Sequence, residues 1–163
     1  MADSSSTTIP LPFRAGMLGV LSGARSTTPL AMLALYRDRP SLDGAWKDWP
    51  VLRSPAGRLA LVLAAAGELV ADKLPMTPAR TNPGPLLGRI GTGAIAGAAI
   101  ATVAGRDGWK GGVLLGAIGG AVGSFAGTWL RTGGAATGLP DAVFALVEDA
   151  ATIACAAAVV AAD

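Results

Sequence analysis

Long apolar runs separated by short polar stretches are the main pattern of this chain. Four of the runs approach the ~20 residues that a helix needs to cross a bilayer, and they cover residues 55–73, 86–104, 111–130 and 139–162. An interrupted apolar run, with stretches at 15–22 and 30–36, precedes them. The pattern predicts an all-α integral membrane protein with about five transmembrane segments.

The first segment is predicted to be broken between residues 25 and 29. Ser26, Thr27 and Thr28 stand directly before Pro29, and hydroxyl residues followed by proline are a strong signal for the start of a helix. We therefore expect two half-helices joined near the membrane midplane. Breaks of this kind are tolerated where the backbone is buried in protein or lines a cavity, and helix N-termini at such breaks in transporters often face an anionic group. The alternative is a proline kink in which Arg25 pairs with a nearby carboxylate.

The chain is expected to form one helical membrane domain over residues 14–163, after a disordered tail at 1–13. The tail is polar and then interrupted by proline, which is typical of a terminus without fixed structure. Arg14 with the apolar stretch after it also has features of a signal peptide, with a cleavage site at Ser22-x-Ala24. Prolines at 75–85 and glycines at 132–138 predict non-helical connections.

Glycines recur at a spacing of four in the middle of the chain, and they predict closely packed helices. The positions singled out for helix packing are Gly93, Gly97, Gly112, Gly116, Gly120, Gly123 and Gly127. Contact between the third and fourth segments of one chain and a seam between two copies are both consistent with this spacing.

Composition supports membrane insertion and excludes several kinds of site. The chain is 52% hydrophobic and 15% charged, whereas soluble domains have about 25% charged residues. It has no histidine and one cysteine, Cys155, so we expect no metal, no cofactor and no catalytic residues. A net charge of +2 without a basic patch gives no indication of nucleic acid binding.

Charged residues inside the apolar segments are the best candidates for a site, because such charges are costly in a bilayer. Glu68 and Asp72 are four residues apart and share one helix face. With five crossings, the charges of all segments fall in the same half of the bilayer, and we expect Glu68 and Glu148 to pair with Arg25, Arg89 or Arg80. The candidate ligand-binding residues are Arg25, Ser26, Thr27, Thr28, Glu68, Asp72, Lys73, Arg80, Asn82, Arg89, Glu148 and Asp149.

The cluster suggests a small channel or transporter-like protein with a site for a small polar or anionic solute. Arg25 and the helix start at Ser26 would contact the solute, while the carboxylates would supply countercharge or proton coupling. The alternative is a non-catalytic structural or assembly subunit, in which the ion pairs fix helix packing. An enzyme ranks third. The expected partners are the lipid bilayer and a homo-oligomer or a membrane-protein complex.

The loops suggest an orientation. Trp46 and Trp49 are expected to anchor the 37–55 loop at the membrane interface. Basic residues are slightly more numerous in the 37–58 and 106–110 regions than on the opposite side. The positive-inside rule then places these loops and the C-terminus in the cytoplasm, which predicts a multi-pass protein of the inner (plasma) membrane.

At several of these positions the chain resembles a family of small bacterial membrane proteins catalogued as "domain of unknown function 4126". The matching motifs are Gly23-x-Arg25 with Pro29-Leu30, Glu68-x-x-x-Asp72-Lys73-x-Pro75 and Leu146-x-Glu148-Asp149. The resemblance covers roughly residues 14–162 and implies a membrane fold with these polar positions. It implies no substrate.

Overall fold

The computed structural model describes residues 9–71, 81–135 and 141–162, and these residues form helices and no strand. The α-helices are α1 (Leu11–Ala24), α2 (Thr28–Leu35), α3 (Pro50–Arg53), α4 (Pro55–Ala71), α5 (Pro83–Ala101), α6 (Trp109–Ala135) and α7 (Asp141–Ala161). Short 3-10 turns are η1 (Pro40–Leu42), η2 (Ala45–Asp48), η3 (Thr102–Ala104) and η4 (Arg106–Gly108).

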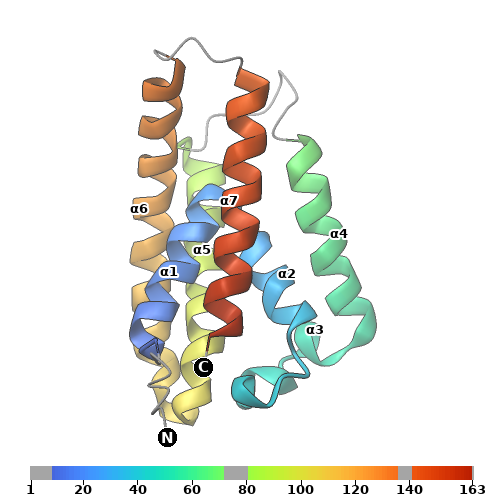
Figure 1. Ribbon diagram of the computed structural model, residues 1–163. Helices are drawn as coiled ribbons and strands as arrows, with labels where there is room; N and C mark the ends of the chain where they lie inside the picture. Colours follow the sequence, from blue (N-terminus) through green and yellow to red (C-terminus); the bar gives the residue numbers. More distant parts are fainter. Residues whose placement is uncertain (1–8, 72–80, 136–140, 163) are drawn as a thin grey trace, which may run out of the picture.

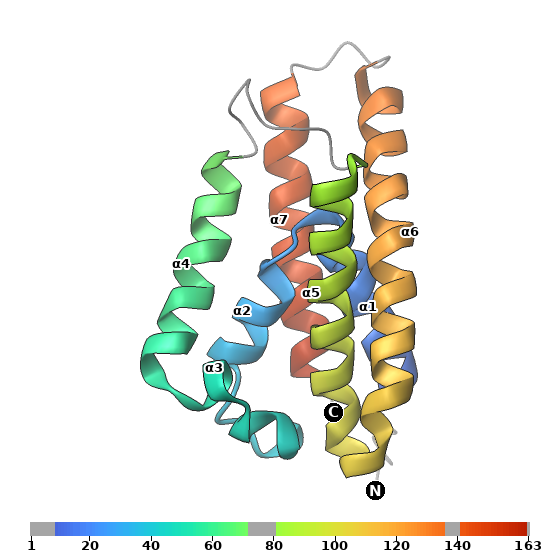
Figure 2. The same ribbon diagram turned by 180° about the vertical axis from the view of Figure 1, so that it is seen from behind.

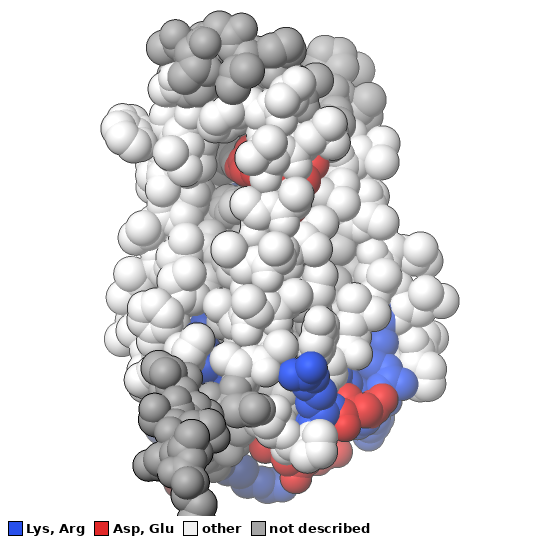
Figure 3. Space-filling view, viewed as in Figure 1, with Lys and Arg blue, Asp and Glu red and all other residues white. Residues whose placement is uncertain are grey.

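Three helical stretches in the described part of the chain are long and apolar enough to cross a membrane, and they cover Pro83–Ala104, Arg106–Leu130 and Val143–Ala161. Large apolar side chains also remain exposed along one face of α6, at Leu114, Ile118, Val122, Phe125 and Trp129. Water would disfavour such a surface, so the fold is compatible with a membrane-embedded protein. Figure 3 shows lysine and arginine gathered at the end of the molecule where both termini lie, below a mostly uncharged surface.

The predicted break in the first segment is confirmed, but its geometry corrects the prediction of a fifth crossing. Helix α1 ends at Ala24 and α2 begins at Thr28. Figures 1 and 2 show that the chain reverses between them, so that α1 rises from one end of the molecule and α2 returns to that end. With 14 and 8 residues, the helices are about 21 and 12 Å long at 1.5 Å per residue. Neither is long enough to cross a bilayer.

Hydrogen bonds at the C-terminal end of α7 hold both ends of this reversal. The guanidinium group of Arg14, at the start of α1, donates to the carbonyl oxygens of Val159 and Val160 at 2.9 and 3.0 Å. The Arg39 guanidinium, shortly after α2, donates to the carbonyl oxygen of Ala161 at 3.0 Å. The start of α1 therefore lies at the same end of the molecule as the end of α7, whereas five crossings would place them at opposite ends.

Glycines allow α1, α5 and α6 to pack with their backbones in contact. A Cβ atom at Gly19, Gly93 or Gly97 would lie less than 3.0 Å from the backbone of Gly112 or Gly116 on α6, and one at Gly120 or Gly123 would be equally close to α5 or α1. These close approaches join helices of one chain. Gly127 is also buried and lines a cavity between α6 and α7.

Several predicted boundaries shift in the structure. The predicted tail at 1–13 overlaps α1, which begins at Leu11. Helix α5 begins at Pro83 inside the segment predicted to be non-helical, because proline is tolerated in the first turn of a helix. Helix α6 continues to Ala135, through the first of the glycines predicted to form a turn. Gly105, with a φ of 128°, permits the tight turn between α5 and α6.

The loop between α2 and α4 packs into the protein more deeply than predicted. Trp46 is fully buried, and its indole N–H donates to the carbonyl oxygen of Leu42 at 3.0 Å. Its backbone N–H donates to the Thr102 hydroxyl at 3.2 Å. Trp46 is therefore a core residue, and the prediction that it anchors the loop at the interface is wrong. Trp49 is half-buried.

Candidate functional site

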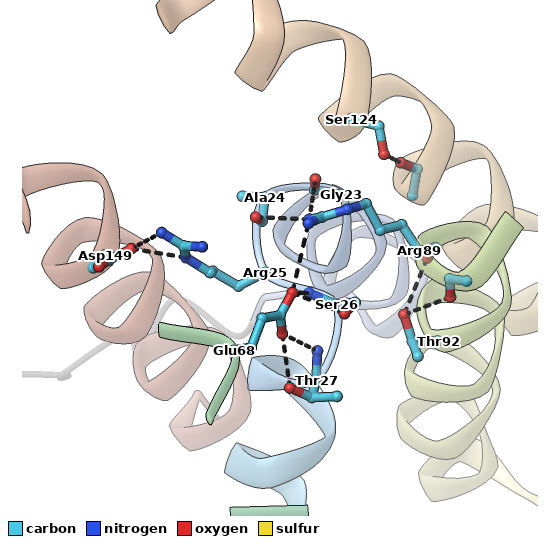
Figure 4. Close-up of polar contacts among 12 residues, drawn as sticks. Gly23, Ala24, Arg25, Ser26, Thr27, Glu68, Arg89, Thr92, Ser124 and Asp149 are labelled. Carbon is cyan, nitrogen blue, oxygen red and sulfur yellow. Dashed lines mark hydrogen bonds and ion pairs between the residues drawn. The ribbon is translucent and has the colours of Figure 1, made fainter. Parts of the chain in front are cut away.

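The tip of the α1–α2 reversal, at Arg25–Thr27, lies where α4, α5 and α7 approach it from three directions (Figures 1 and 4). Arg25 follows α1 in an extended conformation, with φ −140° and ψ 103°. Thr27 is the N-cap of α2, and Pro29 occupies its first turn. A break between two helices leaves backbone N–H groups without helical partners, and in this protein other residues satisfy them.

Glu68 on α4 binds the N-terminus of α2. Its Oε1 accepts hydrogen bonds from the backbone N–H and the hydroxyl of Ser26, at 2.7 and 2.8 Å. Its Oε2 accepts the equivalent pair from Thr27, at 2.9 and 2.8 Å. The sequence predicted that hydroxyls would cap α2, but neither hydroxyl makes a cap bond to the backbone. A carboxylate at a helix N-terminus is also favoured by the helix dipole.

Arg89 on α5 holds the other side of the tip. Its Nη1 donates to the carbonyl oxygens of Gly23 and Ala24, at 2.9 and 2.8 Å, which lie in the last turn of α1. Its Nη2 lies 3.6 Å from Oε1 of Glu68. One guanidinium group thus satisfies the C-terminus of α1 and neutralises the carboxylate that caps α2. Arg89 is only 6% exposed.

Arg25 points away from Glu68 and pairs with Asp149 on α7 (Figure 4). Its Nε donates to Oδ1 of Asp149 at 2.7 Å, and its Nη2 contacts the same oxygen. Arg25 has no exposed surface and Asp149 is 6% exposed. We predicted that Glu68 and Glu148 would pair with Arg25, Arg89 or Arg80. Glu68 does pair with Arg89, whereas Arg25 takes Asp149, the residue after Glu148, as its partner.

Among the described residues, two arginines and two carboxylates therefore meet at the tip, and the formal charges of these four sum to zero. Each buried charge has an oppositely charged partner, which offsets the cost of removing it from water. The cluster joins four parts of the chain: the α1–α2 tip, α4, α5 and α7. Chemically it can recognise a carboxylate or another small anion at the N-terminus of α2, and Glu68 occupies that position in this structure.

Of the remaining predicted residues, the structure describes Thr28, Asn82 and Glu148. Thr28 is buried in the first turn of α2, and Asn82 is the exposed N-cap of α5. Asp72, Lys73 and Arg80 lie outside the described residues.

Glu148 on α7 lines a cavity. This cavity of about 290 Å³ is lined mainly by apolar residues of α1, α6 and α7. Figure 3 shows a little acidic surface in the upper half of the molecule, within otherwise uncharged surroundings.

Two buried polar residues of α1 could not be identified from the sequence. Arg14 is 2% exposed and holds the C-terminal end of α7, although its position before an apolar run suggested only a flanking charge. Ser22 is fully buried, and its hydroxyl has no hydrogen-bond partner in the described structure. A single serine in an apolar run gives no signal of such a position.

The described residues contain no group of three or more His, Cys, Asp or Glu side chains that could hold a metal ion. Comparisons of the chain with protein-family models, with curated proteins and with solved structures give no match. The family resemblance noted from the sequence therefore remains a prediction, and the functional argument depends on the geometry of the tip.

Proposed function

We propose that the protein is a small channel or transporter-like membrane protein for a small polar or anionic solute, with the α1–α2 tip as its solute site. In this arrangement α4, α5, α6 and α7 cross the bilayer, and α1 and α2 form a re-entrant pair. Re-entrant backbone is tolerated in a membrane only where protein buries it or where it lines a cavity. Charged residues inside a membrane are costly and usually mark a substrate or ion pathway.

The observation that carries the proposal is that the N-terminus of α2 is occupied by a carboxylate from the least buried long helix. Glu68 receives two backbone N–H and two hydroxyl hydrogen bonds, a set of donors that would suit a solute anion equally well. No described residue of α4 is buried, and α4 packs mainly on α2 and α3. Withdrawal of α4 would expose these donors together with Arg89, so Glu68 would act as an internal substitute for the solute.

A structural or assembly subunit is the second candidate, and it is favoured by the pairing of the described charges at the tip. Arg25 with Asp149 and Arg89 with Glu68 join three helices to the re-entrant pair. A network of this kind can simply fix the arrangement of helices. In that case the exposed apolar face of α6 would bind a partner protein or a second copy in addition to lipid.

The reversal adds one basic residue to the side that the sequence predicts to be cytoplasmic. Arg14, at the start of α1, lies on the same side as the 37–58 region, because α1 starts at the end of the molecule to which α2 returns (Figure 1). The positive-inside rule then places both termini in the cytoplasm, as part of a proposed inner-membrane location.

Flux measurements on reconstituted protein test the proposal. Liposomes containing the wild-type protein should release small anions, such as chloride, nitrate, formate and phosphate, faster than protein-free liposomes. Glu68→Gln should change this flux in protein that still folds, because it removes the internal anion. Asp48→Asn, at an exposed position in η2, is the matched control and should leave the flux unchanged.

The same preparation separates the two candidates. Flux equal to that of protein-free liposomes for every anion would overturn the transport proposal. Stoichiometric co-purification of another membrane protein after mild detergent extraction would then support the assembly role.

A further inference from the structure

A second cavity, separate from the charged tip, lies between α2, α3, α4 and α5. Its volume is about 480 Å³, and every residue that lines it is apolar or aromatic, including Trp49, Leu61 and Ile95. Leu61 comes from α4, which has no buried residue among those described. The cavity therefore separates α4 from α5 and gives the protein a hollow, apolar surface that water would not fill favourably.

Two arginines adjoin residues that line this cavity. Arg53 is the last residue of α3, whose preceding residues Pro50, Val51 and Leu52 line the cavity. Arg58 stands three residues before Leu61 in α4, so the two residues share one helix face. Arg53 is exposed and Arg58 is half-buried.

The side chains of Arg53 and Arg58 have no hydrogen-bond or ion-pair partner among the residues that the structure describes. Three other basic residues at this end of the molecule do have partners. Arg37 pairs with Asp38, Lys47 pairs with Asp43, and Arg39 donates to a carbonyl oxygen of α7. The positive charge beside the cavity is therefore not compensated within the described part of the protein.

The apolar cavity with positive charge beside it matches the two parts of an anionic phospholipid, namely an apolar acyl chain and a negatively charged headgroup. Helix α4 starts at the end of the molecule where charged residues gather and runs into the uncharged surface (Figures 1 and 3). Arg58 precedes Leu61 in that direction. Trp49 lines the cavity, and tryptophan is enriched at the level of lipid headgroups.

We propose that this cavity binds an anionic glycerophospholipid, with one acyl chain between α4 and α5 and the phosphate at Arg53 and Arg58. Basic residues beside grooves between membrane helices bind anionic headgroups, and the two unpaired guanidinium groups provide the charge complementarity. The site is distinct from the tip and does not depend on the transport proposal.

Native mass spectrometry of the full-length protein, released from micelles with equal amounts of phosphatidylglycerol and phosphatidylcholine, tests this site. The wild-type protein should retain phosphatidylglycerol in preference to phosphatidylcholine. Arg53→Gln/Arg58→Gln should lower the relative retention of phosphatidylglycerol about thirtyfold, because each basic residue near an anionic lipid contributes about 1 kcal/mol. Arg106→Gln/Lys110→Gln removes the same charge at exposed positions around the α5–α6 turn and should retain the preference.

A second variant tests the apolar part of the site. Leu61→Trp should fill the cavity and reduce lipid retention, whereas Leu59→Trp, at a position 58% exposed and outside the cavity lining, should not. Equal retention of both lipids by the wild-type protein would overturn the proposal. An equal loss of phosphatidylglycerol retention in Arg53→Gln/Arg58→Gln and in Arg106→Gln/Lys110→Gln would also overturn it. So would a wild-type dimer that dissociates in Leu61→Trp, because a second copy would then fill the cavity. The arginine variants leave the residues that line the cavity unchanged, so they keep the test valid if Leu61→Trp does not fold.

Discussion

Glu68 and Thr27 are 41 residues apart in the chain, yet Oε2 of Glu68 accepts hydrogen bonds from both the backbone N–H and the hydroxyl of Thr27, at 2.9 and 2.8 Å. One carboxylate oxygen thereby satisfies a helix N-terminus and its N-cap side chain together. The contact holds α4 against the start of α2 (Figure 4). It also fills the position that an anion would take at this helix.

Glu68→Gln should destabilise the protein by about 3 kcal/mol. The carboxamide keeps one acceptor oxygen, but its NH₂ group would face donors of Ser26 or Thr27, and Arg89 would lose its carboxylate partner. Thr27→Ala removes a single hydroxyl and should cost about 1 kcal/mol. Thermal unfolding in nanodiscs, followed by circular dichroism, measures both. An unfolding temperature of Glu68→Gln equal to that of Asp48→Asn would contradict the capping role.

Arg25 and Asp149 should be energetically coupled, because both are buried and each neutralises the other. Arg25→Met or Asp149→Leu alone leaves an uncompensated charge and should cost about 3–5 kcal/mol. The double variant Arg25→Met/Asp149→Leu replaces the pair by apolar side chains and should unfold at a higher temperature than either single variant. Additive losses in this cycle, measured by the same unfolding experiment, would show that the two side chains act independently.

The position of the break in the first segment could be predicted from the sequence, whereas the direction of the chain after it could not. Ser26, Thr27 and Pro29 are local signals, and they fix where a helix starts. The reversal depends on hydrogen bonds from Arg14 and Arg39 to the end of α7. Those partners are more than 120 residues away, and no local pattern indicates them.

The members of the charged cluster were likewise predicted better than their pairing. Arg25, Glu68, Arg89 and Asp149 were all among the candidates, because charges in apolar segments are costly and must find partners. Glu148 and Asp149 are adjacent in the sequence, however, and successive residues of a helix point in different directions. The rotation of α7 decides which of them meets Arg25, and tertiary packing sets that rotation.

Gly116→Ala should destabilise the packing of α5 on α6 by about 1–3 kcal/mol. A Cβ atom at this position would lie less than 3.0 Å from the backbone of Gly93, so the two helices would have to move apart. Gly111→Ala on the same helix is the matched control, because nothing lies within 4 Å of its Cβ position. It should be neutral or slightly stabilising, since alanine favours helix more than glycine does. Equal unfolding temperatures for the two variants would show that the close approach is not required.

The re-entrant arrangement proposed for α1 and α2 predicts that both termini lie on one side of the membrane. In a Cys155→Ser background, a cysteine at Asp107, an exposed position in η4, should be labelled by an impermeant maleimide only from the side where tags at both termini are accessible. If α1 and α2 formed a crossing instead, the N-terminal tag would be accessible from the opposite side. Because α1 and α2 have only 14 and 8 residues, the same-side result is expected. Labelling from the same side would place the charged tip inside the membrane, at the depth where the chain reverses between α1 and α2.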